Sequence, residues 1–357
     1  MRIVVVGVGL IGGSIGLAAR EHVEDAEVIG CGRSRERLGR ALELGAIDGA
    51  ADSLEEALEG AQGCFCCGPV GALPAQIAQA LAAAPADCVV TDVGSVKRGI
   101  VEAAADERFV GGHPVAGAET AGVEHAQPDL FHGAVWYLTP TERSSGILYE
   151  RLHRLVAALG AWPVAIDAES HDRLLATVSH LPHVLANVLV GQAARALSEE
   201  DAALPRAGPS FRDATRVAGA NSAIWTDIYL ANREAIADEI DATVARLQGA
   251  AAALRGGDPE AITAWNEGAA EDRRRLLEAD LAGGAVHELR ITVPNRPGSV
   301  AQVALALGKA GVNILDLALS PAPDMRTGAM TLWIAGDEQA ERARDLIEAL
   351  GFPVVPA

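Results

Sequence analysis

The sequence predicts an α/β protein in which a doubly wound parallel sheet, an all-helical region and a ferredoxin-like unit follow one another. Short apolar runs alternate with helix-period segments over residues 1–168, which is typical of a parallel sheet covered by helices. Residues 169–282 have helical periodicity almost throughout. Residues 286–357 follow the order β-α-β-β-α-β of a ferredoxin-like unit. We therefore expect three domains with these boundaries.

The first domain is expected to build its sheet from short apolar strands. These are Ile3–Val6, Glu27–Cys31, Gly63–Cys66, Cys88–Asp92, Phe109–Gly112 and Ala134–Thr139. The helices expected between them include Arg35–Leu44, Leu73–Ala83 and Lys97–Ala105. In an open sheet of this kind, ligands bind outside the carboxyl ends of the strands.

The middle region contains a long amphipathic helix whose end is marked in the sequence. Apolar residues repeat every three or four positions from Ile236 to Leu254, and Gly256-Gly257 ends the pattern. Asp258-Pro259 then supplies an N-cap and a first-turn proline for the next helix. Apolar stripes of this length exceed what one small domain covers, so we expect a helical homodimer interface.

The last region follows a linker at Gly283-Gly284 and repeats strand and helix patterns on a shorter scale. The expected strands are Glu288–Val293, Val312–Leu319, Met330–Ala335 and Phe352–Val355, and the expected helices are Ser299–Ala310 and Gln339–Leu350.

Composition excludes several classes of partner. The chain has 357 residues, with 29 Lys+Arg against 48 Asp+Glu, and a formal net charge of −19. A nucleic-acid-binding surface needs a basic footprint, and docking on an anionic membrane needs basic clusters, so neither partner is expected. Half of the residues (50%) are hydrophobic, which is enough for a sizeable core.

The expected location is the cytoplasm, as a soluble protein. The apolar stretch Ile3–Ala19 runs into charged residues without a convincing cleavage site, and fits a strand, glycine turn and helix better than a signal peptide. No other apolar run is expected to span a bilayer. The five cysteines form an odd set, so we expect reduced thiols and no zinc site.

A glycine motif follows the first strand. Gly7, Gly9 and Gly12 are spaced as G-x-G-x-x-G and open a helix, with Leu10 and Ile11 between the second and third glycines. In dinucleotide-binding folds the first glycine allows a tight turn, the second lets backbone approach the pyrophosphate, and the third allows close helix–strand packing. The motif predicts a nicotinamide dinucleotide site.

The end of the second strand indicates which dinucleotide binds. An Asp or Glu that would hold the ribose 2′-hydroxyl of NAD is absent there. Arg33, Ser34 and Arg35 instead supply donors for a 2′-phosphate. We therefore expect NADP as the cofactor, with NAD as the alternative if the arginines are only solvated residues at the helix start.

Two polar loops follow strands of the first domain. Thr91–Lys97 lies at the C-terminal end of a strand, so Ser95 and Lys97 are placed for a site, although Ser95 could also cap the next helix. Gly111–Glu119 surrounds His113 with glycines that permit close approach to a substrate. The ordinary pKa of histidine, near 6.5, suits His113 to act as a general base.

Two further polar segments lie in the helical region. Ser179–His183 places His180 and His183 on one helix face, facing either solvent or a site, and no accompanying ligand supports zinc. Phe211–Arg216 places Asp213 three residues before Arg216. The two can pair, and the Arg216 guanidinium can then bind a carboxylate, unless they form only a surface ion pair.

Together these segments resemble the motifs of the prephenate/arogenate dehydrogenase family of tyrosine biosynthesis. The matching segments, in family order, are Gly7–Ser14, Asp92–Lys97, Gly111–Glu119, His171-Asp172, Ser179–His183 and Phe211–Arg216. The resemblance covers about residues 1–280 and implies a Rossmann domain followed by a helical dimerisation domain. Ala118 departs from the hydroxyl residue expected in other members.

Residues 287–357 are similar to ACT domains. The similarity lies in Pro294–Val300 and Lys309–Ile314, with Asn295 in place of a frequent Asp. Such domains commonly bind an amino acid at an interface. The resemblance therefore implies tyrosine as a feedback effector, coupled through the helical dimer.

The family resemblance also implies a reaction and a set of residue roles. Prephenate loses a hydride from C4 to NAD(P)+ and CO₂ from C1, giving 4-hydroxyphenylpyruvate. His113 would be the catalytic base, with Ser95 hydrogen-bonded to the same hydroxyl. The substrate-binding residues would be Arg216, His183, His180, Ser179, Glu119 and Asp213.

Other functions remain open at this stage. Arogenate differs from prephenate only in an amino group, so an arogenate dehydrogenase that forms tyrosine directly is the near alternative. A β-hydroxyacid dehydrogenase would use a lysine as acid/base, and residues 169–282 contain none. A non-catalytic amino-acid sensor would not need the His113, Ser95 and Arg216 set.

Overall fold

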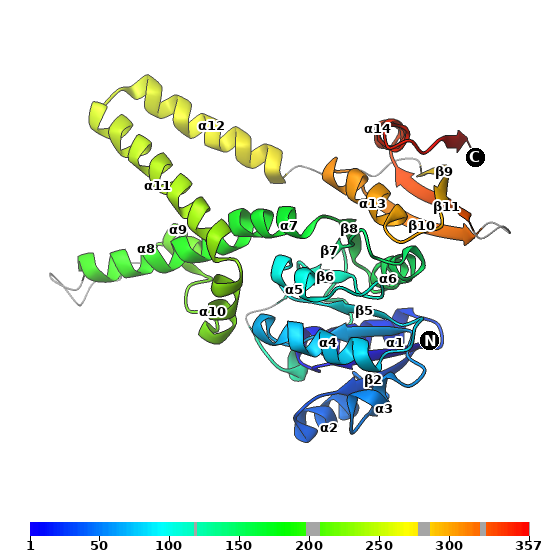
Figure 1. Cartoon of the computed structure of the whole chain (residues 1–357). Coiled ribbons are helices and arrows are strands. Elements are labelled where there is room, and N and C mark those ends of the chain that lie inside the picture. The colour runs from blue at the N-terminus through cyan, green and yellow to red at the C-terminus, as the bar shows by residue number, and fades with distance from the viewer. Residues whose placement is uncertain (118–119, 198–207, 278–285, 322–325, 357) are drawn as a thin grey trace. The chain divides into compact units, whose positions relative to one another are not determined.

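The computed structural model describes residues 1–117, 120–197, 208–277, 286–321 and 326–356 (Figure 1). The chain divides into two compact units, each held together by its own internal contacts. The first consists of Met1–Asp172 together with Gly284–Ala357, and the second is Arg173–Gly283. The predicted first and third domains thus belong to one unit, and the helical region forms the other.

A five-stranded parallel sheet forms the centre of the first unit. Its strands are β1 Arg2–Val6, β2 Glu27–Cys31, β3 Gly49–Ala50, β4 Gly63–Cys66 and β5 Val89–Asp92, in the order β3-β2-β1-β4-β5. Side chains of β1 alternate between two cores: Ile3 and Val5 join one cluster, and Val4 and Val6 join the other. Both faces are buried because helices cover both, as the continuous apolar run predicts.

The predicted helices between these strands are present. They are α1 Leu10–His22, α2 Arg35–Glu43, α4 Leu73–Ala83 and α5 Arg98–Ala103, and a short helix that was not predicted, α3 Leu54–Leu58, joins them. Strand β3 has two residues and was not predicted, because a strand that short has no readable alternation.

The later strands of the first domain form a separate, mixed sheet. Strands β6 Gly111–Pro114 and β7 Val135–Thr139 pair antiparallel, and β7 pairs parallel with β8 Trp162–Ala165. A single bridge, Val90 with Phe109, links this region to β5. Helix α6 Gly146–Ala158 connects β7 to β8.

The C-terminal region has the predicted β-α-β-β-α-β order. Its elements are β9 Val286–Pro294, α13 Ser299–Lys309, β10 Ile314–Pro321, β11 Thr327–Ala335, α14 Asp337–Ala349 and β12 Val354–Pro356. The strands form one antiparallel sheet in the order β10-β11-β9-β12, which is the ferredoxin-like arrangement. Buried Ile291, Val303 and Leu332 belong to its core.

This C-terminal sheet packs against α6 and β8 of the same unit. A β-carbon at Gly308 would lie 1.8 Å from the Ala165 carbonyl oxygen, so only glycine permits this approach. The Gly298 N–H donates to the Ser144 carbonyl at 3.0 Å, and Arg154 Nε donates to the Leu317 carbonyl at 3.1 Å. Close backbone approach and hydrogen bonds therefore join the two regions.

The second unit is helical. After α7 Ala168–Leu175, which spans the boundary, the described residues form a π-helical turn at Ala176–His180 and the helices α8 Leu181–Leu197, α9 Pro209–Thr215, α10 Ser222–Ala231, α11 Arg233–Gly256 and α12 Pro259–Leu277. Helix α11 ends at Gly257, which has a left-handed φ of 65°. The Glu260 N–H donates to Asp258 Oδ1 at 3.0 Å, which confirms the predicted cap.

One described helical stretch, Ala168–Ala196, is long and apolar enough to cross a membrane by length and composition alone. The expectation that no apolar run beyond Ile3–Ala19 has this length is therefore wrong. The stretch carries the buried polar residues His171, Asp172, His180 and His183. Ionisable groups are costly in a lipid bilayer, and each of these four has a polar partner within the fold.

Candidate active site

The glycine loop between β1 and α1 has the geometry that its motif predicts. Gly7 has a φ of 100°, which permits the tight turn. A β-carbon at Gly12 would lie 2.3 Å from the Gly7 carbonyl oxygen and 2.8 Å from Val5 Cγ1, so glycine is required for helix–strand packing. A β-carbon at Gly9 would meet nothing within 4 Å, which leaves open space beside the helix start. The loop fits a dinucleotide pyrophosphate.

At the end of β2, the predicted phosphate donors have contacts of their own. Ser34 Oγ accepts from the Arg37 N–H at 3.2 Å and so caps α2. The exposed Arg35 guanidinium pairs with Asp52. Arg33 is exposed as well. Arg35 would therefore have to exchange Asp52 for a phosphate, a cost that the sequence does not reveal.

A buried ion pair joins the end of β5 to the start of β6. Lys97 Nζ contacts Asp92 Oδ2 and donates to the Gly112 carbonyl at 2.7 Å, while both charged side chains are 0% exposed. Asp92 also accepts from the Gly94 and Gly112 N–H groups. Burial lowers the pKa of Lys97, and Asp92 opposes that shift. Lys97 is therefore a structural anchor for the strand that carries His113.

His113 is one end of a chain of three buried polar side chains. His113 Nδ1 lies 2.9 Å from His171 Nε2, and His171 Nδ1 lies 2.8 Å from Asp172 Oδ1. Burial lowers the pKa of His171, and its hydrogen bond to Asp172 acts in the opposite direction. Tyr137 of β7 packs edge-on against the His171 ring, with centroids 5.6 Å apart.

Asp172 also caps helix α5. Its Oδ1 accepts from the Lys97 N–H at 2.7 Å and its Oδ2 from the Arg98 N–H at 2.9 Å. The alternative role of Ser95 as the cap of this helix is therefore wrong, because a carboxylate is the stronger acceptor. Ser95 lies half-buried in the loop between β5 and α5. Glu119 and Ala118 lie outside the described residues.

In the helical unit, His183 lies in an aromatic cluster that the sequence did not reveal. Its ring stacks on Trp225, with centroids 3.5 Å apart and planes at 7°. Its Nδ1 lies 2.5 Å from the Tyr229 hydroxyl and 3.3 Å from Asn187 Nδ2. Burial lowers the pKa of His183. The four-residue spacing of Trp225 and Tyr229 on one helix was the available signal.

His180 adjoins the same cluster. Its Nδ1 lies 3.2 Å from Asn232 Nδ2, and its ring meets Trp225 edge-on with centroids 6.1 Å apart. Ser179, the residue before His180, is half-buried. The π-helical turn at Ala176–His180 lies directly before α8, and such turns are frequent at functional sites. The prediction that His180 and His183 share a face is confirmed by their common contact with Trp225.

Arg216, the residue predicted to bind a substrate carboxylate, lies at the end of α9. Arg216 is the C-cap residue of that helix, and its backbone N–H contacts the Asp213 carbonyl oxygen at 3.4 Å. Both side chains are exposed. Their predicted role in binding an anion remains a prediction.

Two family models match segments of this chain. Residues 15–164 match the nucleotide-binding domain of prephenate dehydrogenase, and residues 167–267 match its dimerization domain. Prephenate dehydrogenase from Bacillus subtilis (strain 168) is 30% identical over 354 residues, covering 97% of this chain and 95% of that protein.

Solved structures give the same result. Prephenate dehydrogenase from A. aeolicus, in complex with hydroxyphenyl propionate and NAD+, has a TM-score of 0.72 and 28% identity, covering 78% of this chain and 98% of that one. Synechocystis arogenate dehydrogenase has a TM-score of 0.69 and 28% identity, covering 77% of this chain and 100% of that one.

The glycine loop, the parallel sheet and the helical second unit define a nucleotide-binding dehydrogenase of two-unit build. Two family models and a full-length relative narrow the class further. The chain belongs to the prephenate dehydrogenase family.

Proposed function

We propose that this chain catalyses the oxidative decarboxylation of prephenate to 4-hydroxyphenylpyruvate with NAD(P)+ as hydride acceptor. The observation that carries the proposal is His113, buried beside His171 and Asp172 in the nucleotide-binding unit. A histidine held in this way suits the reaction, which must remove one proton from a ring hydroxyl. The relatives named above act on this substrate or on its amino analogue.

The residues proposed to hold the cofactor are those of the glycine loop. The open space at Gly9 and the N-terminus of α1 suit the pyrophosphate, with Gly7, Leu10, Ile11 and Gly12 forming the turn around it. What a bound nicotinamide supplies is an acceptor for the hydride that leaves ring carbon C4. The chain's own residues must orient the substrate and manage its proton and its carboxylates.

His113 is the proposed base, and Ser95 the proposed hydrogen-bond partner of the same 4-hydroxyl. As hydride leaves C4, the hydroxyl proton passes to His113, and loss of the ring carboxylate as CO₂ makes the ring aromatic. The Lys97–Asp92 pair fixes the backbone of Gly112, one residue before His113. This rigidity keeps the base within the narrow distance that proton transfer requires.

The proposed substrate-binding residues supply charge and shape. Arg216 would bind a substrate carboxylate through its planar fork, with Asp213 and Glu119 in an ion network around it. His183, His180 and Ser179 would contact the substrate from the helical unit. The stacking of His183 on Trp225 gives that contact a fixed ring plane.

NADP is the proposed cofactor and NAD the alternative. Gly32, Arg33 and Ser34 leave room and donors at the end of β2, and Arg35 would join once released from Asp52. The test compares kcat/KM for the two cofactors in the wild type and in Arg33→Ala. We expect the variant to lose preference for NADP, and a strong preference of the wild type for NAD would contradict the assignment.

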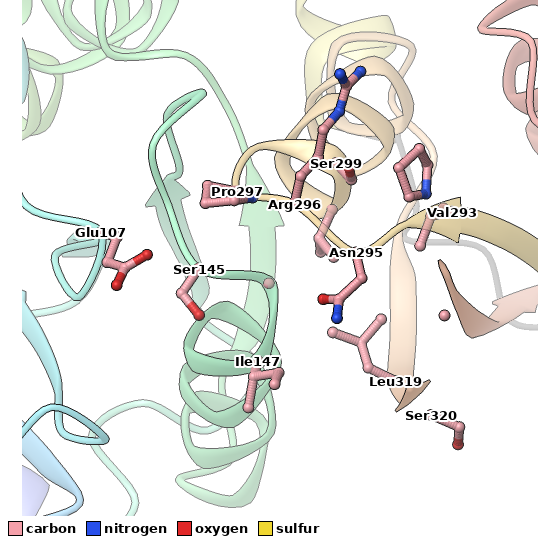
Figure 2. A pocket seen from close by; sticks show the side chains of 14 residues that line it. Glu107, Ser145, Ile147, Val293, Asn295, Arg296, Pro297, Ser299, Leu319 and Ser320 are labelled. Atoms are coloured by element: carbon pink, nitrogen blue, oxygen red, sulfur yellow. The ribbon is translucent and has the colours of Figure 1, made fainter. Parts of the chain in front are cut away.

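Tyrosine is the proposed effector of the ACT-like region. A cavity of ≈ 200 Å³ lies between the start of α6 and the loop after β9, lined by Ser145, Ile147, Asn295 and Arg296 among others (Figure 2). In Figure 2 the Asn295 amide points toward Ile147 and Leu319. We expect tyrosine to inhibit the full chain and Asn295→Ala to weaken that inhibition. Equal inhibition of both proteins would place the effector elsewhere.

A soluble cytoplasmic homodimer is the proposed working form. Apolar side chains including Val188, Leu247 and Leu254 are exposed on the helical unit, which matches a family dimerization domain. A second copy would remove such a surface from water. Sedimentation of the purified chain tests this proposal, and a monomer at micromolar concentration would contradict it.

The decisive experiment separates the two substrates. Purified protein is incubated with prephenate or arogenate and either oxidised cofactor, and the product is identified together with reduced nicotinamide. We expect 4-hydroxyphenylpyruvate from prephenate at the higher kcat/KM. Higher kcat/KM for arogenate, with tyrosine as product, would favour the alternative, and turnover of neither would refute the proposed function.

A further inference from the structure

The hydrogen-bonded chain that runs from His113 through His171 ends at the Asp172 carboxylate. Asp172 accepts three hydrogen bonds, from the backbone N–H groups of Lys97 and Arg98 and from His171 Nδ1. Both carboxylate oxygens accept from backbone N–H donors, at 2.7 and 2.9 Å, so Asp172 also acts as the acceptor toward His171 Nδ1. His171 must therefore carry its proton on Nδ1, toward Asp172.

The tautomer of His171 then determines which ring nitrogen of His113 carries its proton. Burial lowers the pKa of His171, so the ring is neutral and holds only the Nδ1 proton. Its Nε2 is left as an acceptor, 2.9 Å from His113 Nδ1. That distance is a hydrogen bond only when His113 carries a proton on Nδ1. In neutral His113 the lone pair is then on Nε2.

We propose that His171 and Asp172 are positioning residues that fix His113 as the Nδ1–H tautomer, so that His113 Nε2 receives the substrate's hydroxyl proton. This inference rests on the proposed function, in which His113 is the base. His113 becomes an imidazolium when it takes the proton, and its Nδ1–H continues to donate to His171. The Asp172 carboxylate, one ring further on, stabilises the positive charge that develops.

The fixed tautomer also depends on the burial of these three side chains. His171 is 0% exposed, Asp172 is 4% exposed and His113 is 7% exposed, so water does not compete for either hydrogen bond. Tyr137 packs on one side of His171 and fixes the ring plane. A tautomer set in this way needs no rearrangement at the moment of proton transfer.

Two substitutions at one position test the hydrogen bond. In His171→Gln an amide oxygen can accept from His113 Nδ1, whereas His171→Leu fills similar space without an acceptor. We expect His171→Leu to lower kcat by about 10²-fold with little change in KM, and His171→Gln to recover most of that loss. Equal kcat values for the two variants would overturn the proposal, and so would a His171→Leu enzyme of wild-type kcat.

The nitrogen-15 NMR spectrum of histidine-labelled full-length protein tests the tautomers without any turnover. We expect His113 and His171, assigned through His113→Gln and His171→Gln, to show a protonated Nδ1 and an unprotonated Nε2 at mildly alkaline pH. A His113 protonated on Nε2 would overturn the proposal even if prephenate is oxidised. The predicted spectrum in a protein that oxidises neither prephenate nor arogenate would leave the tautomer assignment standing and refute the function alone.

Discussion

Two pairs of buried histidines, His113 with His171 and His180 with His183, differ in their hydrogen-bond partners. His113 and His171 lead to the Asp172 carboxylate, which accepts hydrogen bonds and donates none. His183 contacts the Tyr229 hydroxyl and the Asn187 amide, groups that both donate and accept. Burial lowers the pKa of His171 and of His183 alike. Burial alone therefore does not separate the two roles.

The partner decides what each histidine can do. A carboxylate fixes which ring nitrogen carries the proton, which suits a group that must accept a proton at one known atom. Amide and phenol partners leave that choice open, which suits a group that binds a ligand by shape and hydrogen bonding. We therefore expect substitutions in the first pair to change kcat and substitutions around the second to change KM.

His113→Ala should produce the largest effect. Loss of a general base typically lowers kcat by about 10²–10⁴-fold. KM for prephenate and the unfolding midpoint should change little compared with kcat, although the buried ring packs against His171. Steady-state kinetics and urea unfolding measure both quantities. His22→Ala, at the exposed end of α1, is the matched control. Near-normal turnover of His113→Ala would remove the residue from its role.

Arg216→Ala should come next, and should act on KM. A charge-assisted bidentate contact contributes about 1.5–3 kcal/mol, which corresponds to a KM increase of about 10–150-fold. Arg216→Lys keeps the positive charge but loses the planar two-pronged contact, so its KM should lie between those of the wild type and Arg216→Ala. Arg212→Ala, one turn earlier on α9, serves as control. If kcat falls while KM stays constant, Arg216 does not bind the ground-state substrate.

The contrast between the two pairs also shows what sequence reasoning could reach. Features set by neighbours in the chain were predicted, such as the Gly7 turn, the Asp258 cap and the order of elements in residues 286–357. Such features depend on local periodicity and on single-residue conformational preferences. The general positions of His113 and His183 were predicted in the same way.

Contacts between distant segments were not predicted. Asp172 caps α5 from 75 residues away, and His171 meets His113 across 58 residues. No periodicity encodes such a pairing, so the local pattern offers Ser95 as an alternative cap for a helix that Asp172 caps. The stack of Trp225 on His183 was missed for the same reason.

Tyr229→Phe should have a smaller effect, confined to the second pair. The phenyl ring keeps the packing against Trp225 and removes only the hydroxyl that contacts His183 Nδ1. One neutral hydrogen bond contributes about 0.5–1.5 kcal/mol, so we expect KM to rise by about 2–12-fold at unchanged kcat. A loss confined to kcat would show that the two pairs share one function.

His153 of α6 should have no effect on turnover at neutral pH, and it isolates what burial does alone. Its side chain is 1% exposed and packs beside Tyr149, and burial lowers its pKa from 6.5 to about 4, opposed by nearby Asp316. Between these pH values the unfolded chain binds a proton that the folded chain does not. The free energy of unfolding should therefore fall by about 3 kcal/mol as pH drops through that window.

His153→Phe removes this titration while filling similar space, so its free energy of unfolding should fall less than that of the wild type between pH 6.5 and 4. Urea unfolding at a series of pH values measures the difference, and His22→Phe at an exposed position should track the wild type. Parallel curves for wild type and His153→Phe would contradict the prediction. Suppose instead that the two stability curves diverge while kcat stays equal. A buried neutral histidine without a catalytic role would then affect acid stability alone. The Asp172 carboxylate would remain the feature that distinguishes the pair of His113 and His171.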